Sequence, residues 1–182
     1  MSYDGSKNQV SYSGHLMKKG VAAELIVSEW LATIYDSVED VSLLKDYQKK
    51  EIDFIVNNDP ASGIECKGDS YIGKTRNMLY ECERHTAKGD FKVKPGWSTF
   101  SEAASAVYVC DGMLYIITMK DLREAYRENS ALCAEKRKSA NCRYILTDCE
   151  RTTMNILIPE SIWGKYTTII TLDKVQTEDG NE

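Results

Sequence analysis

Apolar and polar residues alternate along two short runs, 51–56 and 63–67, and this period of two predicts two β-strands. The stretch between the runs is rich in Asn, Asp, Pro and Ser, so we expect the strands to pair as a hairpin. Side chains along a strand alternate between its two faces. Glu65 and Lys67 are therefore expected on one face of the second strand, with Cys66 on the other.

Two longer segments, about 16–35 and 120–136, show the three-to-four-residue apolar spacing of helices that pack on one side. In the first helix, the apolar positions expected to face the core are Val21, Leu25, Trp30, Leu31 and Ile34. In the second, they are Leu122, Ala125, Tyr126 and Leu132. Glu24 lies in the middle of the first helix.

The rest of the chain predicts mostly strands and loops. Extended or strand segments are expected at 36–45, 77–84, 106–110, 113–119, 143–147, 154–158 and 166–172. Asp111-Gly112 indicates a tight two-residue hairpin turn, and a short helical turn is expected at 99–103. The fold class that follows is α/β, with a mixed central β-sheet flanked by helices. We expect a flexible N-terminal segment (1–13), a single domain (14–174) and a flexible acidic tail (175–182).

Composition argues against several classes of protein but does not identify the reaction. The chain has 182 residues and a formal net charge of −5, which weighs mildly against non-specific nucleic-acid binding. No apolar run reaches the roughly 18 residues needed to span a bilayer, and the N-terminus lacks a secretory pattern. The six cysteines form no Cys-x-x-Cys pair, which favours reduced, mostly buried thiols over a zinc site. We therefore expect a cytoplasmic protein without a membrane partner.

The predicted hairpin carries the candidate chemistry. If it brings Asp53 alongside Glu65 and Lys67, two carboxylates and one ammonium converge on one spot. Carboxylates that close repel each other unless something positive lies between them. A divalent cation with oxygen ligands suits such a site, and Mg²⁺ needs only one or two carboxylates plus phosphate oxygens. This arrangement favours metal-assisted attack on a phosphodiester.

Three motifs in this order, Gly20-x-x-Ala-Glu24, Ile52-Asp53-Phe54 and Ile64-Glu65-Cys66-Lys67, resemble those of the PD-(D/E)XK nuclease superfamily, most closely its Holliday-junction-resolvase-type endonucleases. The resemblance covers about a third of the chain and implies a restriction-endonuclease-like core. Ile52 stands where the superfamily name has proline. The helix expected soon after the Glu-x-Lys strand is delayed or shortened, with an additional strand inserted.

The resemblance also implies roles for individual residues. Asp53, Glu65 and Glu24 would be catalytic metal ligands, joined by the main-chain carbonyl of Cys66. The cofactor would be Mg²⁺, with Mn²⁺ able to substitute. Lys67 would lie beside the attacking water, either as a base or as a stabiliser of developing charge. The alternatives are surface carboxylates at Asp53 and Glu65, a structural salt bridge at Lys67 and a solvated helix residue at Glu24.

Candidate DNA contacts flank these motifs: Lys49, Lys50, Lys74, Arg76, Lys92, Lys94 and Trp97. For each basic residue the alternative is an ordinary surface charge. For Trp97 the choice is between stacking on an unpaired base and anchoring the core or a loop. Glu81 and Glu83 alternate on a predicted strand, and one of them is a further candidate for the acidic cluster.

The sequence thus predicts a metal-dependent endonuclease acting on duplex or branched DNA. Its cleavage is expected to be structure-selective or weakly specific, as in a phage or mobile element. A homodimer is expected if the substrate is a four-way junction, because two symmetric cuts need two sites. Two rival hypotheses stay open. One is a catalytically silent nucleic-acid- or protein-binding module on the same fold. The other is a nuclease subunit that takes its specificity from a partner.

Overall fold

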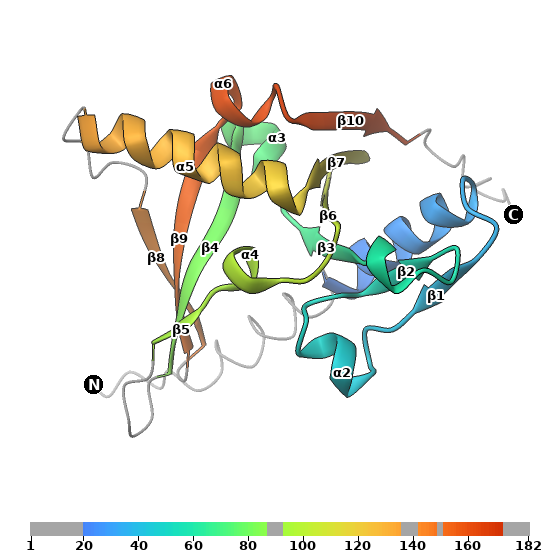
Figure 1. The fold of residues 1–182 in the computed structure, drawn as a ribbon. Helices are drawn as coiled ribbons and strands as arrows, with labels where there is room; N and C mark the ends of the chain where they lie inside the picture. The colour runs from blue at the N-terminus through green and yellow to red at the C-terminus, as the bar shows by residue number, and fades with distance from the viewer. Residues whose placement is uncertain (1–19, 87–92, 136–141, 149–150, 173–182) are drawn as a thin grey trace, which may run out of the picture.

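A computed structural model describes residues 20–86, 93–135, 142–148 and 151–172 of the chain (Figure 1). A first helix covers residues 20–32. The elements that follow are β1 (Val38–Asp40), α2 (Lys45–Gln48), β2 (Phe54–Val56), a 3-10 turn (Pro60–Ser62), β3 (Ile64–Gly68), α3 (Ile72–Thr75), β4 (Asn77–Thr86), β5 (Val93–Pro95), α4 (Trp97–Phe100), β6 (Ser105–Cys110), β7 (Met113–Thr118), α5 (Met119–Glu135), β8 (Cys142–Asp148), β9 (Arg151–Pro159), α6 (Glu160–Trp163) and β10 (Thr167–Thr171).

The central sheet has six strands in the order β1-β2-β3-β6-β7-β10. Its strands pair antiparallel except β3 and β6, which run parallel, so the predicted mixed sheet flanked by helices is confirmed. Asp111 and Gly112 join β6 to β7 with positive φ angles of 46° and 77°, which matches the expected two-residue turn. The hairpin between β2 and β3 also forms as predicted, through the register pair Phe54 and Ile64.

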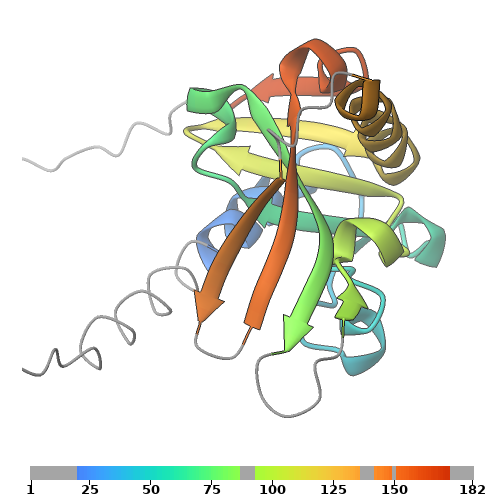
Figure 2. The same ribbon diagram turned by 90° about the vertical axis from the view of Figure 1, so that its left-hand side faces the viewer.

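A second sheet, which the sequence did not predict, has four antiparallel strands in the order β5-β4-β9-β8. Figure 2 shows its strands crossing in front of those of the central sheet. The expectation of one mixed sheet was therefore incomplete. Strand β4 pairs with β9, about 70 positions further along the chain, and shifts register between Glu81 and Glu83. Such distant pairing leaves no local sequence signal, which is why the alternation alone assigned strands but not sheets.

The first helix packs on one face of the central sheet through Ala23, Val27 and Leu31, which are at most 3% exposed. Of the positions predicted to face the core, Leu31 is buried and Trp30 is partly buried against the same cluster, but the prediction was wrong for two others. Val21 is 63% exposed and Leu25 60% exposed. Positions 23, 27 and 31 satisfy the same helical period as 21 and 25, and the small Ala23 allows close approach to the sheet. Ile34, also assigned to the core, is exposed beyond the helix end.

The opposite face of the central sheet builds the larger core, which the second sheet and α5 close. Leu122 and Ala125 of α5 are fully buried there, and Tyr126 stacks on Tyr80 with ring centroids 4.3 Å apart. Three cysteines have described side chains, and all three are buried, as expected: Cys66, Cys82 and Cys110. No helix in the described ranges is long and apolar enough to cross a membrane.

Candidate active site

Asp53 and Glu65 lie side by side where the β2–β3 hairpin opens. Phe54 pairs with Ile64, so Asp53 is the next residue opposite Glu65, and the Asp53 N–H donates to the Ile64 carbonyl at 2.9 Å. Glu65 alternates with Ile64 and Cys66, which face the first helix, and its own side chain therefore points between the two sheets. The expectation that the hairpin brings these carboxylates together agrees with this geometry.

The Asp53 carboxylate also contacts the backbone of β3. Its Oδ2 accepts a hydrogen bond from the Cys66 N–H at 2.8 Å. The N–H and carbonyl of one strand residue point to the same edge, so the Cys66 carbonyl faces the edge that Asp53 occupies. Strand β2 begins at Phe54, so none of its residues pairs with the edge of β3 at Cys66. The geometry thus leaves the Cys66 carbonyl on the same side as the Asp53 carboxylate, as the resemblance implied for a metal ligand.

Glu65 is a buried carboxylate with one unsatisfied oxygen. Glu65 is only 1% exposed, and its Oε1 forms an ion pair with the Lys67 ammonium. Burial raises the pKa of Glu65 to about 7, although Lys67 opposes the shift. Among the residues that the structure describes, nothing donates a hydrogen bond to the buried Glu65 Oε2. A buried oxygen without a partner is costly, and a bound cation would satisfy it.

Lys67 lies between an anion and an aromatic ring. Its side chain is 31% exposed, and its Nζ is 4.9 Å from the centroid of the Trp97 ring. Burial works against the charged form, but the Glu65 and Asp53 carboxylates outweigh it and raise the pKa of Lys67 to about 12. The Lys67 ammonium is therefore charged at neutral pH.

Glu24 reaches the same cluster from the first helix. Burial raises its pKa, Asp53 and Asp40 raise it further, and Lys67 lowers it. These interactions place Glu24 within electrostatic range of the Asp53 carboxylate. Asp40, on β1, is an acid that the sequence analysis did not single out. Its register partner is Phe54, next to Asp53 in the chain, so strand pairing rather than local sequence brings it near.

A second charged cluster borders this site. The Arg84 guanidinium donates to Glu51 Oε1 at 2.8 Å and to Glu81 Oε1 at 2.6 Å. Neither Glu51 nor Arg84 was predicted to have a role, although Glu51 lies two positions before Asp53, on the same face of the predicted strand. Glu51 adopts a left-handed backbone conformation with φ of 53° and contributes negative charge at both Glu65 and Lys67. The prediction that Glu81 or Glu83 adjoins the acidic site stays a prediction, with Glu81 held by Arg84.

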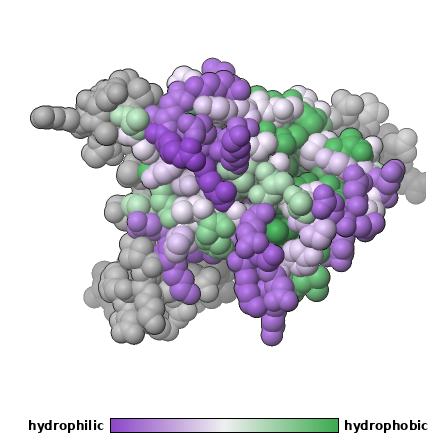
Figure 3. Space-filling model, in the orientation of Figure 1, coloured by the Kyte–Doolittle hydropathy of each residue, from purple (hydrophilic) through white to green (hydrophobic). Residues whose placement is uncertain are grey.

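The proposed DNA-contacting residues do not gather into one patch. Lys49 and Lys50 follow α2, whereas Lys74 and Arg76 lie in and after α3, at the opposite end of the molecule in Figure 1. Figure 3 shows the surface over α2 as hydrophilic. Three of the basic residues have acidic partners: Lys49 with Asp46 at 2.9 Å, Lys50 with Glu102 at 3.0 Å and Arg76 with Glu160 at 2.6 Å. Lys74 and Lys94 are exposed, and Lys92 lies outside the described residues.

Trp97 is 2% exposed, so its ring is not offered to a DNA base at the surface. Its main-chain N–H donates to Glu81 Oε1 at 3.3 Å, and its ring centroid lies 6.1 Å from that of Tyr108. This placement agrees with the alternative that Trp97 anchors the core.

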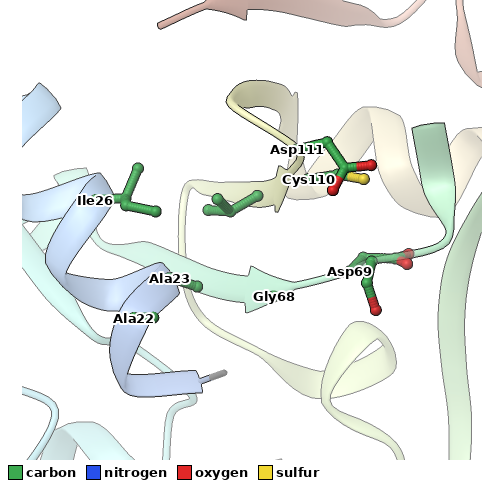
Figure 4. Close-up of a pocket in the computed structure, with 9 residues that line it drawn as sticks. Ala22, Ala23, Ile26, Gly68, Asp69, Cys110 and Asp111 are labelled. Carbon is green, nitrogen blue, oxygen red and sulfur yellow. The ribbon is translucent and has the colours of Figure 1, made fainter. Parts of the chain in front are cut away.

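A shallow pocket lies on the other side of the central sheet, at the ends of the parallel strands β3 and β6. Figure 4 shows the first helix on one side of it, with Asp69, Cys110 and Asp111 on the other. The Asp69 carboxylate accepts from the N–H groups of Tyr71 and Ile72, at 2.8 and 3.2 Å, and so begins α3. Its hydrogen bonds therefore serve the local turn.

No group of three or more His, Cys, Asp or Glu side chains is arranged to hold a metal ion within the described ranges. Mg²⁺ makes a smaller demand, because one or two carboxylates suffice when water and phosphate complete the shell. Asp53 and Glu65 are two neighbouring carboxylates, and the Asp53 carboxylate also contacts the main chain of Cys66. No known protein family, curated protein or solved structure was found to match the chain.

Proposed function

We propose that the protein is a Mg²⁺-dependent DNA endonuclease of the PD-(D/E)XK type, with a restriction-endonuclease-like core. The observation that carries this proposal is the buried Glu65 Oε2, which has no partner in the described part of the chain and lies beside Asp53 and a charged Lys67. A purely structural ion pair would use both carboxylate oxygens or expose the idle one to water. A bound cation would satisfy this oxygen, which is costly to leave buried without a partner.

Asp53, Glu65 and the Cys66 carbonyl would hold the cation, with Glu24 as a direct or water-mediated ligand. When bound, Mg²⁺ would activate a water and offset charge on the phosphate oxygens. Lys67, as a charged ammonium, would act as an electrostatic stabiliser, because an ammonium has no free electron pair to accept a proton. Its charge would offset the one that develops at phosphorus during attack.

The proposed substrate is duplex or branched DNA, and a homodimer is expected if that substrate is a four-way junction. One observation favours a variant of this proposal. The basic residues are dispersed, and several are already neutralised by acidic partners, so the chain offers little focused attraction for phosphates. That pattern favours a nuclease subunit whose partner supplies DNA affinity and specificity.

Nicking of supercoiled plasmid tests the proposal directly. Wild-type protein is expected to nick DNA with Mg²⁺ or Mn²⁺ and to be silent with chelator. Glu65→Gln preserves the volume of the side chain but removes the ligand charge, and should reduce the rate by roughly 10²-fold or more. Glu29→Gln, at an exposed position of the same helix as Glu24, is the matched control and should retain full activity.

A substrate panel then separates the variants of the proposal. Four-way junction, flap, linear duplex, single-stranded DNA and RNA are each offered with Mg²⁺, Mn²⁺ or chelator. Cleavage of no substrate, together with DNA binding unaffected by Glu65→Gln, would favour the silent binding module. Cleavage that appears only after a second protein is added would favour the subunit.

A further inference from the structure

The Lys67 ammonium has two neighbours of different kinds. On one side it forms an ion pair with Glu65, and on the other it lies 4.9 Å from the Trp97 ring centroid. A cation within about 6 Å of an aromatic face is attracted by the negative charge of that face, and tryptophan is the strongest partner. Trp97 therefore restricts the position of the Lys67 ammonium. As an uncharged ring, it does not compete with Lys67 for the carboxylates.

The Trp97 ring is itself held rigidly, because α4 is fixed to β4 at its first residues. The Gly96 N–H donates to the Cys82 carbonyl at 2.7 Å, and the Trp97 N–H donates to Glu81 Oε1 at 3.3 Å. The Ser98 hydroxyl accepts from the Glu81 N–H at 3.0 Å. A Cβ at position 96 would lie 2.3 Å from the Glu81 carbonyl oxygen, so only glycine permits this approach.

A second set of contacts holds the end of α4. Arg123 of α5 donates to the carbonyls of Ser98 at 3.2 Å and of Ser101 at 2.6 Å. The Ser101 hydroxyl in turn donates to the Glu51 carbonyl at 3.0 Å, two residues before Asp53. Helix α4 thus connects the second sheet, α5 and the start of the Asp53 segment. Such extensive anchoring of a four-residue helix indicates that the position of its tryptophan matters.

We propose that Trp97 is a positioning residue that holds the Lys67 ammonium against Glu65 and so fixes where its positive charge meets the substrate. The catalytic part of this inference rests on the proposed nuclease function. The positioning part does not, because it concerns only the contact between Lys67 and Trp97.

NMR of metal-free protein with isotope-labelled lysine tests the positioning. The ring current of Trp97 should shift the ε-methylene protons of Lys67 upfield from those of an exposed lysine such as Lys120. Lys67→Arg assigns the signal by removing it. Trp97→Phe keeps an aromatic face and should retain part of the shift, whereas Trp97→Leu should lose it. Lys165, 5.0 Å from the Tyr166 ring, is an internal control whose signal should stay unchanged.

Kinetics test the catalytic consequence. Trp97→Leu should lower kcat roughly tenfold with KM within twofold, because a misplaced Lys67 weakens stabilisation of the transition state more than binding of the substrate. Trp97→Phe should recover most of that loss. If Trp97 had a purely structural role, the kcat of the two variants would instead fall in proportion to their loss of thermal stability.

Two outcomes would overturn the inference. A Lys67 signal without an upfield shift in the wild-type protein would show that the contact is not populated, whether or not the variants fold. A kcat in Trp97→Leu equal to that of the wild type would show that the contact does not serve catalysis. If the wild-type protein cleaves nothing with any metal, the nuclease proposal fails, and the NMR result still decides whether Trp97 positions Lys67.

Discussion

The side chain of Asp53 accepts a hydrogen bond from the main-chain N–H of Cys66 at 2.8 Å, at the point where β2 stops pairing with β3. One carboxylate oxygen thus completes the edge of a strand, while the same group contributes charge beside Glu65. Burial raises the pKa of Asp53, and Lys67 and the Cys66 N–H lower it. Structural and chemical roles of Asp53 are therefore separable by mutation.

Replacing Asp53 by Ala and by Asn should separate those roles. Asp53→Ala leaves the Cys66 N–H without its acceptor and should lower the free energy of unfolding by about 1–3 kcal/mol. Asp53→Asn keeps an acceptor oxygen and removes a partly buried charge, so it should stay within about 1 kcal/mol of wild type. Urea denaturation of the metal-free proteins measures both values.

The same two variants should lose the stabilisation that Mg²⁺ gives the wild-type protein, because both remove the ligand charge. Thermal melts with and without millimolar Mg²⁺ provide this comparison. Equal destabilisation by Asn and Ala would contradict the role assigned to the Cys66 hydrogen bond. A Mg²⁺ effect retained in Asp53→Asn would contradict its role as a ligand.

Glu65 predicts an unusual pH dependence for the metal-free protein. Its pKa is about 7 in the folded protein and near the ordinary value of 4.5 when unfolded. Between pH 4.5 and 7 the folded state binds more protons than the unfolded state. The stabilisation that comes from protonated Glu65 is therefore complete below pH 4.5 and is lost as the pH rises through 7. Relative to Glu65→Gln, wild type should lose roughly 1–3 kcal/mol between pH 5 and 8.5. Parallel stability curves for the two proteins, measured with chelator present, would contradict the prediction.

The convergence of Asp53, Glu65 and Lys67 was predictable because it depends on local geometry. A two-residue alternation places Glu65 and Lys67 on one face, and a hairpin turn fixes which residue lies opposite. In the six-stranded sheet β2, which begins directly after Asp53, lies next to β3, which carries Glu65 and Lys67. Chemistry that rests on one hairpin can thus be inferred from about fifteen residues.

The surroundings of the site depend on contacts between distant segments, and these left no local signal. Arg84 reaches Glu51 across 33 positions, and Ser101 reaches the Glu51 carbonyl across 50. The buried position of Trp97 follows from the docking of α4 onto β4, not from the Pro-Gly-Trp sequence. The sequence left both base stacking and core anchoring open for Trp97, and only the packing shows that it lies in the core.

The Arg84 pairings should matter more for stability than an exposed ion pair. Arg84→Met would leave Glu51 and Glu81, whose side chains are 17% and 13% exposed, without their cation. Unpaired charges that are largely buried are costly, and we expect a loss of about 1–3 kcal/mol at pH 7. Arg127→Met is the matched control, since Arg127 pairs with Glu124 at the surface and should cost under about 0.5 kcal/mol. Equal losses in chemical denaturation would show that Arg84 contributes no more than a surface charge.

Gly96 offers the sharpest test of how α4 is attached. An alanine Cβ at this position would lie 2.3 Å from the Glu81 carbonyl oxygen and 2.8 Å from the Cys82 carbonyl carbon, both of them backbone atoms that do not rotate away. Gly96→Ala should therefore push α4 off β4 and cost at least about 2 kcal/mol. Gly20→Ala is the matched control, because a Cβ at Gly20 meets nothing within 4 Å and alanine favours the helix. That variant should be neutral or up to about 1 kcal/mol more stable. Because the displaced helix carries Trp97, Gly96→Ala should also reduce the upfield shift of Lys67, and an unchanged Lys67 signal in a destabilised variant would contradict the link between the two.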